Sequence, residues 1–573
     1  MRDISARPDT KKYLPILILN GVLAVLVIIR AFLCIHVTDE VFNIGQAFRT
    51  IQGNVFLVEN WDYFQTGDFF LTPFLYVFYK ITGSAEGIVL FSRVIFIILQ
   101  ILLSVLLYKI LSRFFERISA LFAVLIYSTA VSFLLFYMWY DNWEIFFRLI
   151  GLFLVFYVIS YAEQKPAKKL CLLVLIAGVS HACMVFAYPT MFLLYVYVLA
   201  LLFLYRRKQS SKVHNLLALF YILGSALVFM VFMLYMFKIG ISNLFVFNST
   251  MAEAGLSSTG REGFFSIASI IEKTKALFVE NIVFYMFSIA ILALDLLILY
   301  VFRNNKRRII IFCSIMVFGC LFLLLMTVFR VDSLNTLMTY LSFYTIPLYL
   351  LVRKESDKKS HYKDLIIILW TSSFIAGFVY SMTALNGAIK FSAGARTGAI
   401  VTILLLFEAL KKCDMKLDLK TVFGMLASLM MILNVFAVYS FSFEGTKPLA
   451  CNTMIKSGIY RGIIDVPENA KRYETVEKDL ADVITEGDKT IACGPFAMEF
   501  YLMSDLKPDA ANLWDPNNTD LLFAYYDIYY GEPDIIVLHD SAWDVTSQEF
   551  LDFVEENYKV VKYTDGYLIY HHK

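Results

Sequence analysis

The chain has 573 residues, of which 59% are apolar and 16% aromatic, and its mean hydropathy is +0.67. This composition is more apolar than that of soluble domains and indicates an integral membrane protein. The formal net charge is only +2, so no basic field points to nucleic acid as a partner.

A basic segment, residues 1–13, precedes an apolar run from Leu14 to His36. The run lacks a small-residue cleavage pattern, so we interpret it as an uncleaved first transmembrane helix. Since a helix needs about 20 residues to cross a bilayer, the pattern predicts a polytopic α-helical membrane protein with about thirteen transmembrane helices. The further spans are predicted at 86–108, 119–137, 145–162, 170–187, 190–205, 214–237, 278–302, 309–329, 335–352, 364–382, 397–410 and 421–443.

Lys and Arg are concentrated in alternate connections between these spans. One set of connections holds 27 Lys and Arg residues, whereas the other set, which includes the long loops 37–85 and 238–277, holds nine. Because loops on the cytoplasmic side are enriched in Lys and Arg, this asymmetry predicts a multi-pass plasma-membrane protein with a cytoplasmic N-terminus. Merging 170–205 into one span would place the basic stretches RNNKRR and RKESDKKSHYK outside. We therefore predict two separate spans in this region and an odd total number of spans. With a cytoplasmic N-terminus, an odd number places the C-terminal tail at the outer face.

The first outer loop, 37–85, carries aromatic residues throughout its length, such as Phe42, Trp61 and Phe70. Such a pattern is expected of short amphipathic helices that lie on the membrane surface. For any single aromatic residue, an interfacial aromatic belt is an equally simple explanation.

After about residue 444 the composition becomes polar, which predicts a separate domain over 444–573 beside the transmembrane domain 1–443. Its helix-like stretches alternate with short apolar strands, which favours a compact extracytoplasmic α/β domain. Of the eight cysteines, only Cys451 and Cys493 lie in this tail. A disulfide between them would require an extracytoplasmic tail, and the sequence fixes no distance between them.

Acidic residues mark the outer loops. Asp39 and Glu40 open the first loop directly after the first span, and Asp141 lies with Glu144 in the second outer loop, MWYDNWE. A carboxylate at a membrane face either meets water or holds a cation, a proton or a substrate. Cations are predicted close by: Arg93 near the outer end of the second span, and Lys390 and Arg396 in the loop 383–396.

Carboxylates and cations from separate loops suit a lipid phosphate site. The acids would hold a divalent metal ion or accept a proton, while Arg and Lys would bind the phosphate oxygens. The metal question stays open at this point, with Asp39, Asp141 and His181 as candidate ligands. For His181, a hydrogen-bonded structural histidine is the commoner alternative.

With its acidic pair opening a long first loop, Arg93 in the second span and Asp141 in the second loop, the chain resembles the integral membrane glycosyltransferases of the GT-C fold. The resemblance is to the branch of the protein O-mannosyltransferases and the lipid A aminoarabinose transferase. It implies transfer of a sugar from a polyprenyl phosphate-linked donor, on the outer face of the membrane, to an acceptor in a bacterial cell envelope. It also implies Asp39 as the catalytic acid that activates the acceptor, with Glu40 beside it and Asp141 as the second essential acid.

The physical chemistry of such a transfer suits these residues. Polyprenyl phosphate leaves as a stabilised anion, so cations at Arg93, Lys390 or Arg396 would assist its departure and no strong general acid is needed. The sequence departs from the family between Asn60 and Leu75. The family typically has a Pro-Pro-Leu pattern in this stretch, whereas this chain has a single proline, Pro73.

Two other classes of protein share parts of this pattern. A transporter or flippase would place more ionisable residues inside the spans and would show broken helices repeated in two halves. A ligase or polymerase of lipid-linked glycans would share the outer-face site, but would more often carry it on a late loop. The early acidic loops favour the glycosyltransferase.

Overall fold

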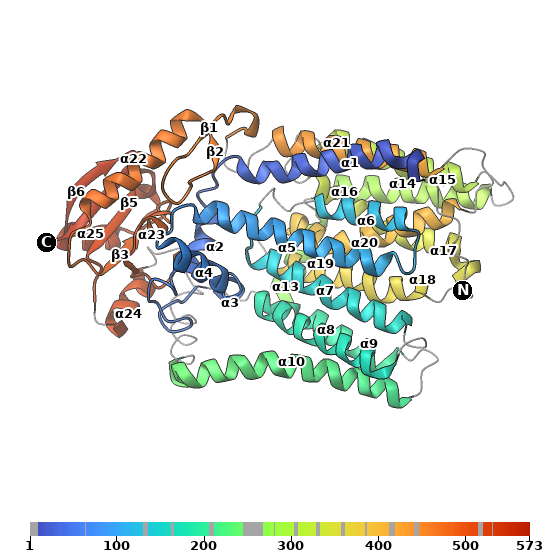
Figure 1. The fold of residues 1–573 in the computed structure, drawn as a ribbon, viewed down its shortest axis with the longest axis horizontal. Coiled ribbons are helices and arrows are strands. Elements are labelled where there is room, and N and C mark those ends of the chain that lie inside the picture. The colour runs from blue at the N-terminus through green and yellow to red at the C-terminus, as the bar shows by residue number, and fades with distance from the viewer. Residues whose placement is uncertain are drawn as a thin grey trace.

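In the computed structural model the chain forms a long helical bundle with a small α/β domain at one end (Figure 1). The structure describes residues 10–62, 65–129, 136–161, 166–205, 211–243, 267–279, 281–302, 308–327, 333–356, 361–383, 387–411, 419–440, 446–513, 519–529 and 531–573.

Among the described residues, eight helices are long and apolar enough to cross a membrane, and five shorter apolar helices accompany them. These thirteen segments correspond one to one to the thirteen predicted spans, which confirms the predicted helical membrane architecture. The helices of the bundle are α1 (Thr10–Ile29), α5 (Ile88–Leu111), α6 (Arg117–Thr129), α7 (Tyr140–Tyr161), α8 (Ala167–Ala187), α9 (Phe192–Leu204), α10 (Ser211–Ile239), α13 (Ile267–Val279), α14 (Ile282–Val301), α15 (Arg308–Thr327), α16 (Ser333–Phe343), α17 (Thr345–Ser356), α18 (His361–Asp364), α19 (Thr371–Thr383), α20 (Gly387–Leu410) and α21 (Leu419–Ser440).

The N-terminal end of α1 and the α/β domain lie at opposite ends of the bundle (Figure 1). This arrangement follows from the odd number of crossings. The side of the membrane that each end faces stays the prediction made from the Lys and Arg asymmetry.

The prediction for α20 was wrong at its start. Residues 383–396 were expected to form an outer loop, but α20 begins at Gly387 and includes Lys390 and Arg396. Small residues lower the hydropathy of its first turns and also allow close packing: a Cβ atom at Gly394 would lie 2.1 Å from the backbone nitrogen of Gly377 in α19. The segment from Lys390 to Leu410 is consequently buried along its whole length.

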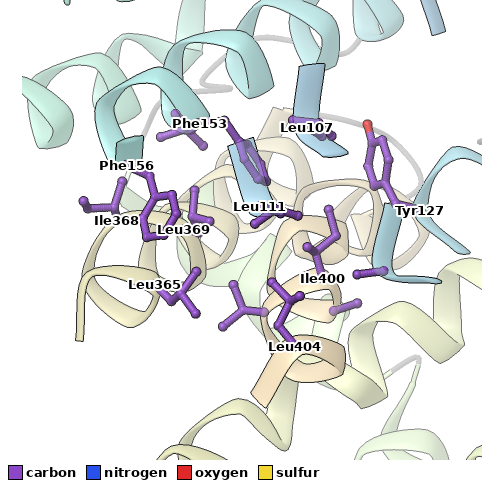
Figure 2. Packing of buried hydrophobic residues seen from close by; sticks show 14 of the residues in the cluster. Leu107, Leu111, Tyr127, Phe153, Phe156, Leu365, Ile368, Leu369, Ile400 and Leu404 are labelled. Atoms are coloured by element: carbon purple, nitrogen blue, oxygen red, sulfur yellow. The ribbon is translucent and has the colours of Figure 1, made fainter. Parts of the chain in front are cut away.

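The bundle core lies where α5, α6, α7 and α20 meet the π-helical segment η5 (Leu365–Trp370). Figure 2 shows Leu107, Leu111, Phe153, Phe156 and Ile400 from these elements packed together. Burial of such large apolar side chains against neighbouring helices fixes the relative positions of α7 and α20, the helices that carry Asp141 and Lys390.

The first outer loop folds into three short helices, α2 (Asp39–Phe48), α3 (Gln65–Asp68) and α4 (Thr72–Thr82), which lie between the bundle and the α/β domain (Figure 1). α4 exposes Tyr76, Val77 and Ile81, as expected of a helix at a membrane surface. α2 differs from the expectation, because its residues from Glu40 to Phe48 are all buried. It packs against α3, α4 and α5 on one hand and against α23 (Phe500–Met503) of the α/β domain on the other.

The C-terminal domain is an α/β unit, as predicted. Its five-stranded sheet has the order β4-β3-β5-β7-β6, in which β3 is parallel to β4 and β5, and β7 is antiparallel to β5 and β6. The strands are β1 (Thr453–Met454), β2 (Ile464–Asp465), β3 (Thr490–Cys493), β4 (Lys507–Pro508), β5 (Ile535–His539), β6 (Tyr558–Thr564) and β7 (Tyr567–His572), and the helices are α22 (Pro467–Val483), α23 (Phe500–Met503), α24 (Thr519–Tyr529) and α25 (Gln548–Asn557). The two-residue strands β1, β2 and β4 were not predicted.

The first loop and the C-terminal domain are joined by buried hydrogen bonds. The Arg49 guanidinium donates to the carbonyl of Ala510 at 2.7 Å, and the Asp62 carboxylate accepts from the backbone N–H of Leu513 at 3.2 Å. The Trp61 backbone N–H donates to the carbonyl of Ala511. These contacts hold α2 and the chain after it against the domain.

Candidate functional site

Glu40 and Arg93 form a buried two-pronged ion pair. Arg93 Nε donates to Glu40 Oε1 at 2.7 Å and Arg93 Nη2 donates to Glu40 Oε2 at 2.5 Å, and both side chains are almost fully buried. The other N–H groups of Arg93 donate to the carbonyls of Ala31, Leu33 and Cys34. All five N–H groups of this guanidinium are therefore engaged, and none is left for a phosphate oxygen in this conformation.

The ion pair joins the end of the first span, the start of α2 and the second span. Arg30 strengthens the same junction by donating to the carbonyls of Leu33 and Val438 rather than to a carboxylate. Burial and the charges of the two arginines lower the pKa of the buried His36 well below its ordinary value. Glu40 and Arg93 thus position the loop.

Asp39 is the first residue of α2 and is only partly buried, in contrast to Glu40. Consecutive residues on a helix point about 100° apart, so the Glu40 pair fixes α2 while the Asp39 carboxylate is directed elsewhere. It lies within electrostatic range of the Tyr140 hydroxyl.

Acids of the first loop and of α7 lie around Tyr140. The prediction that Asp141 and Glu144 lie in a second outer loop was wrong, because α7 begins at Tyr140 and includes both. Asp39 and Asp68 of the first loop and Asp141 of α7 all interact electrostatically with this residue. The approach is close, because a Cβ atom at Gly67 would lie 2.4 Å from the Cβ of Tyr140. Together with Lys390 from α20, these residues form what we call the Tyr140 cluster: Asp39, Asp68, Tyr140, Asp141 and Lys390.

Lys390 faces Asp141 across the cluster. Lys390 Nζ forms an ion pair with Asp141 Oδ2 and lies 4.3 Å from the ring centroid of Trp139 and 5.5 Å from that of Tyr140. The second oxygen of Asp141, Oδ1, is buried and has no hydrogen-bond partner among the described residues. The Lys390 ammonium is thus held by one carboxylate and two aromatic faces.

Asp68 is buried more deeply than Asp39. It is 1% exposed, and neither of its carboxylate oxygens has a hydrogen-bond partner among the residues that the structure describes. Burial, with a smaller contribution from the nearby charge of Asp62, raises the pKa of Asp68 well above its ordinary value. Asp68 therefore favours its protonated form.

A second charged group lies next to the Tyr140 cluster, deeper along α7. Arg148 Nε donates to Glu144 Oε1 at 2.8 Å, and the Tyr380 hydroxyl donates to Glu144 Oε2. Arg396 of α20 lies within electrostatic range of Asp141 and Arg148. Three cations (Arg148, Lys390 and Arg396) and two carboxylates (Asp141 and Glu144) thus lie together beside the carboxylate of Asp39.

His181 does not lie in a metal-binding arrangement. Its Nδ1 is 2.7 Å from the Tyr221 hydroxyl and its Nε2 is 3.3 Å from the carbonyl of Arg148, so both ring nitrogens are engaged. Within the described part of the chain, no group of three or more His, Cys, Asp or Glu side chains is placed to hold a metal ion. We therefore derive no step through a metal.

The sequence identified most of these charged residues but not their pairing, and it missed Tyr140 and Tyr380. Tyr140 precedes Asp141 directly, so its position was available as a signal. Nothing in the sequence distinguishes Tyr380 among 35 tyrosines.

No family model matches the chain, and no curated protein matches it. Among solved structures, the crystal structure of ArnT from Cupriavidus metallidurans in the apo state is similar to the chain over 97% of both chains, with a TM-score of 0.41 and 11% sequence identity. At this identity and TM-score, no residue role or substrate is transferred from ArnT to this chain.

Proposed function

We propose that this protein is a membrane glycosyltransferase that moves a sugar from a polyprenyl phosphate-linked donor to an acceptor of the cell envelope. The observation that carries the proposal is the Tyr140 cluster, in which acids of the first loop and of α7 meet Lys390, with Arg396 and Arg148 close by. The reaction needs both a proton acceptor and a partner for an anionic leaving group, and this site offers both.

Asp39 is the proposed base. It is the cluster acid that retains exposure, whereas Asp68 is sealed and favours its protonated form, and Asp141 is paired with Lys390. In the proposed step, the acceptor hydroxyl oxygen attacks the anomeric carbon while the Asp39 carboxylate takes the hydroxyl proton. The bond from the anomeric carbon to the phosphate oxygen breaks, and a single attack of this kind inverts the anomeric centre.

Lys390 and Arg396 are the proposed partners of the donor phosphate. Both lie on α20, a buried helix that close packing holds in place, and Arg396 lies within electrostatic range of Asp141 and Arg148. Fixed cations stabilise the charge that develops on the departing phosphate without needing to reorganise. Glu40 and Arg93, which the sequence analysis included in the site, are proposed to position α2.

The test is transfer of radiolabelled sugar from lipid-linked donors by the purified protein, with Asp39→Asn beside wild type. Loss of a positioned general base lowers turnover by about 10²–10⁴-fold. Asp544→Asn is the matched control, because Asp544 is an exposed acid of the C-terminal domain, and it should retain wild-type turnover. A chelator arm tests the predicted divalent metal.

Equal turnover by Asp39→Asn and wild type would remove Asp39 from the mechanism. Absence of transfer from every donor by a folded wild-type protein would instead favour a transporter, a flippase or a ligase of lipid-linked glycans.

A further inference from the structure

Two cysteines that are distant in sequence meet at the junction between the first span and the C-terminal domain. The Sγ atoms of Cys34 and Cys451 lie 3.3 Å apart and are separated by 417 positions along the chain. Cys34 is fully buried, whereas Cys451 is partly exposed. The disulfide considered from the sequence paired Cys451 with Cys493, which is buried in strand β3.

The backbone around Cys34 is already tied to the C-terminal domain. The Cys34 backbone N–H donates to the carbonyl of Ile464 at 3.0 Å, and Leu33 forms a parallel bridge with the same residue of β2. The backbone N–H of Ile35 donates to the Asp465 carboxylate at 2.9 Å. Residues 33–35 thus run beside β2.

Cys34 also has an unusual backbone conformation. Its φ of 60° lies in the left-handed region, which is rare for a residue with a side chain. Such a conformation persists only where the surroundings over-determine it. Here the contacts with β2 and the bond from Arg93 Nη2 to the Cys34 carbonyl hold the residue so that its thiol faces Cys451.

We propose that Cys34 and Cys451 form a disulfide that links the end of the first span, just before the first loop, to the C-terminal domain. The two sulfur atoms need to approach by only about 1.3 Å to reach bonding distance. The Lys and Arg asymmetry predicts that this end of the protein faces the outer side of the membrane, where disulfides form and persist.

The reaction is thiol–disulfide exchange with an external disulfide, such as that of a thiol oxidoreductase. Cys451, the more accessible of the two, loses its thiol proton and attacks one sulfur of the incoming disulfide, whose S–S bond breaks and releases one thiolate. Cys34 then attacks the Cys451 sulfur of the mixed disulfide, forms the Cys34–Cys451 bond and releases the second thiolate. The two cysteine thiols lose two electrons and two protons, and the external disulfide is reduced to two thiols.

The surroundings suit Cys34 for the second step. Arg30 lies within electrostatic range of Cys34, and its positive charge stabilises a Cys34 thiolate. The nucleophile of this step is a thiolate, which the nearby cation favours.

The experiment counts oxidised cysteines in the full-length protein isolated from membranes without reductant. Free thiols are blocked with N-ethylmaleimide under denaturing conditions, the protein is then reduced, and the newly released thiols are labelled with maleimide-polyethylene glycol. Two labels are expected on wild type and on the control Cys493→Ser, and none on Cys34→Ser or on Cys451→Ser. Peptide mass spectrometry of unreduced wild type should contain the linked Cys34 and Cys451 peptides.

Wild-type protein without a label would overturn the proposal. Two labels retained in Cys34→Ser would overturn it as well, because the disulfide would then join other residues. The linked peptide is sought in wild type, so the result stands even if the serine variants do not fold. The count does not depend on sugar transfer, so failure of this proposal and failure of the proposed function are distinguishable.

Discussion

Removal of the Arg93 guanidinium is predicted to destabilise the protein severely. In Arg93→Met the Glu40 carboxylate, which is completely buried, would lose the guanidinium with which it forms a two-pronged ion pair. Three backbone carbonyls at the end of the first span would also lose a donor. Breaking a buried ion pair from one side costs about 3–5 kcal/mol, because the remaining charge stays in a medium of low dielectric constant.

The matched control is an exposed ion pair of the same chemistry. Arg461 Nη1 lies 3.2 Å from Glu86 Oε2, and the two side chains are 60% and 38% exposed. An exposed pair of this kind contributes about 0–1 kcal/mol. The free energy of unfolding would be measured for Arg93→Met and Arg461→Met by denaturant titration in detergent micelles.

A double-mutant cycle isolates the interaction between the two buried charges. Glu40→Gln alone leaves the Arg93 charge without a carboxylate, whereas the double variant removes both charges together. The losses in the free energy of unfolding for Arg93→Met and Glu40→Gln, added together, should therefore exceed the loss for the double variant by about 2–3 kcal/mol. Additive effects, or a cost for Arg93→Met no larger than that for Arg461→Met, would refute the reasoning.

Three further variants test the site and the C-terminal domain. Gly67→Ala should cost about 1–3 kcal/mol in the free energy of unfolding and lower sugar transfer, because the new Cβ would overlap Tyr140. Lys390→Met should lower kcat/KM for the lipid-linked donor by about 10–100-fold, the worth of one charge-assisted bond to phosphate, with partial recovery in Lys390→Arg. Burial raises the pKa of Asp509 from 3.8 to about 7, so the folded state holds this proton more tightly than the unfolded state and wild type loses stability as pH rises from 4 to 7. Asp509→Asn should remove that loss and melt at a higher temperature than wild type above pH 7; equal melting curves from pH 4 to pH 8 would contradict it.

The sequence predicted the positions of the helices well, because each crossing is a local run of apolar residues that requires no knowledge of its neighbours. The main strands of the tail were predicted for the same reason. α7 and α20 were exceptions at their starts. α7 begins at Tyr140 and includes Asp141 and Glu144, and the first turns of α20 are buried by close packing of glycine and other small residues rather than by apolar bulk. Hydropathy records the composition of a helix, and it does not record how closely a neighbouring backbone approaches.

The pairing of charges depends on contacts that the sequence does not order. Glu40 and Arg93 are 53 positions apart, and Asp141 and Lys390 are 249 apart. Each residue was recognised as a charge near the outer face, but four separate charges allow several pairings. The burial of α2 was likewise unpredictable, because part of the surface it packs against belongs to a domain that begins some 400 positions later in the chain.

Asp39 and Glu40 are neighbours in sequence with opposite surroundings, and the geometry of a helix explains the difference. Successive side chains on α2 diverge by about 100°, so Glu40 points to Arg93 in the buried junction while Asp39 remains partly exposed on the side of Tyr140. Because α2 is fixed by the Glu40 ion pair, Asp39 has a defined position. A base that is already positioned is more effective than one that must first be brought into place. The acidic pair therefore combines an anchor with a proposed base. These different roles predict different defects in the two variants. Glu40→Gln should lower both the free energy of unfolding and the rate of sugar transfer. Asp39→Asn should lower the rate of sugar transfer and leave the free energy of unfolding close to that of wild type.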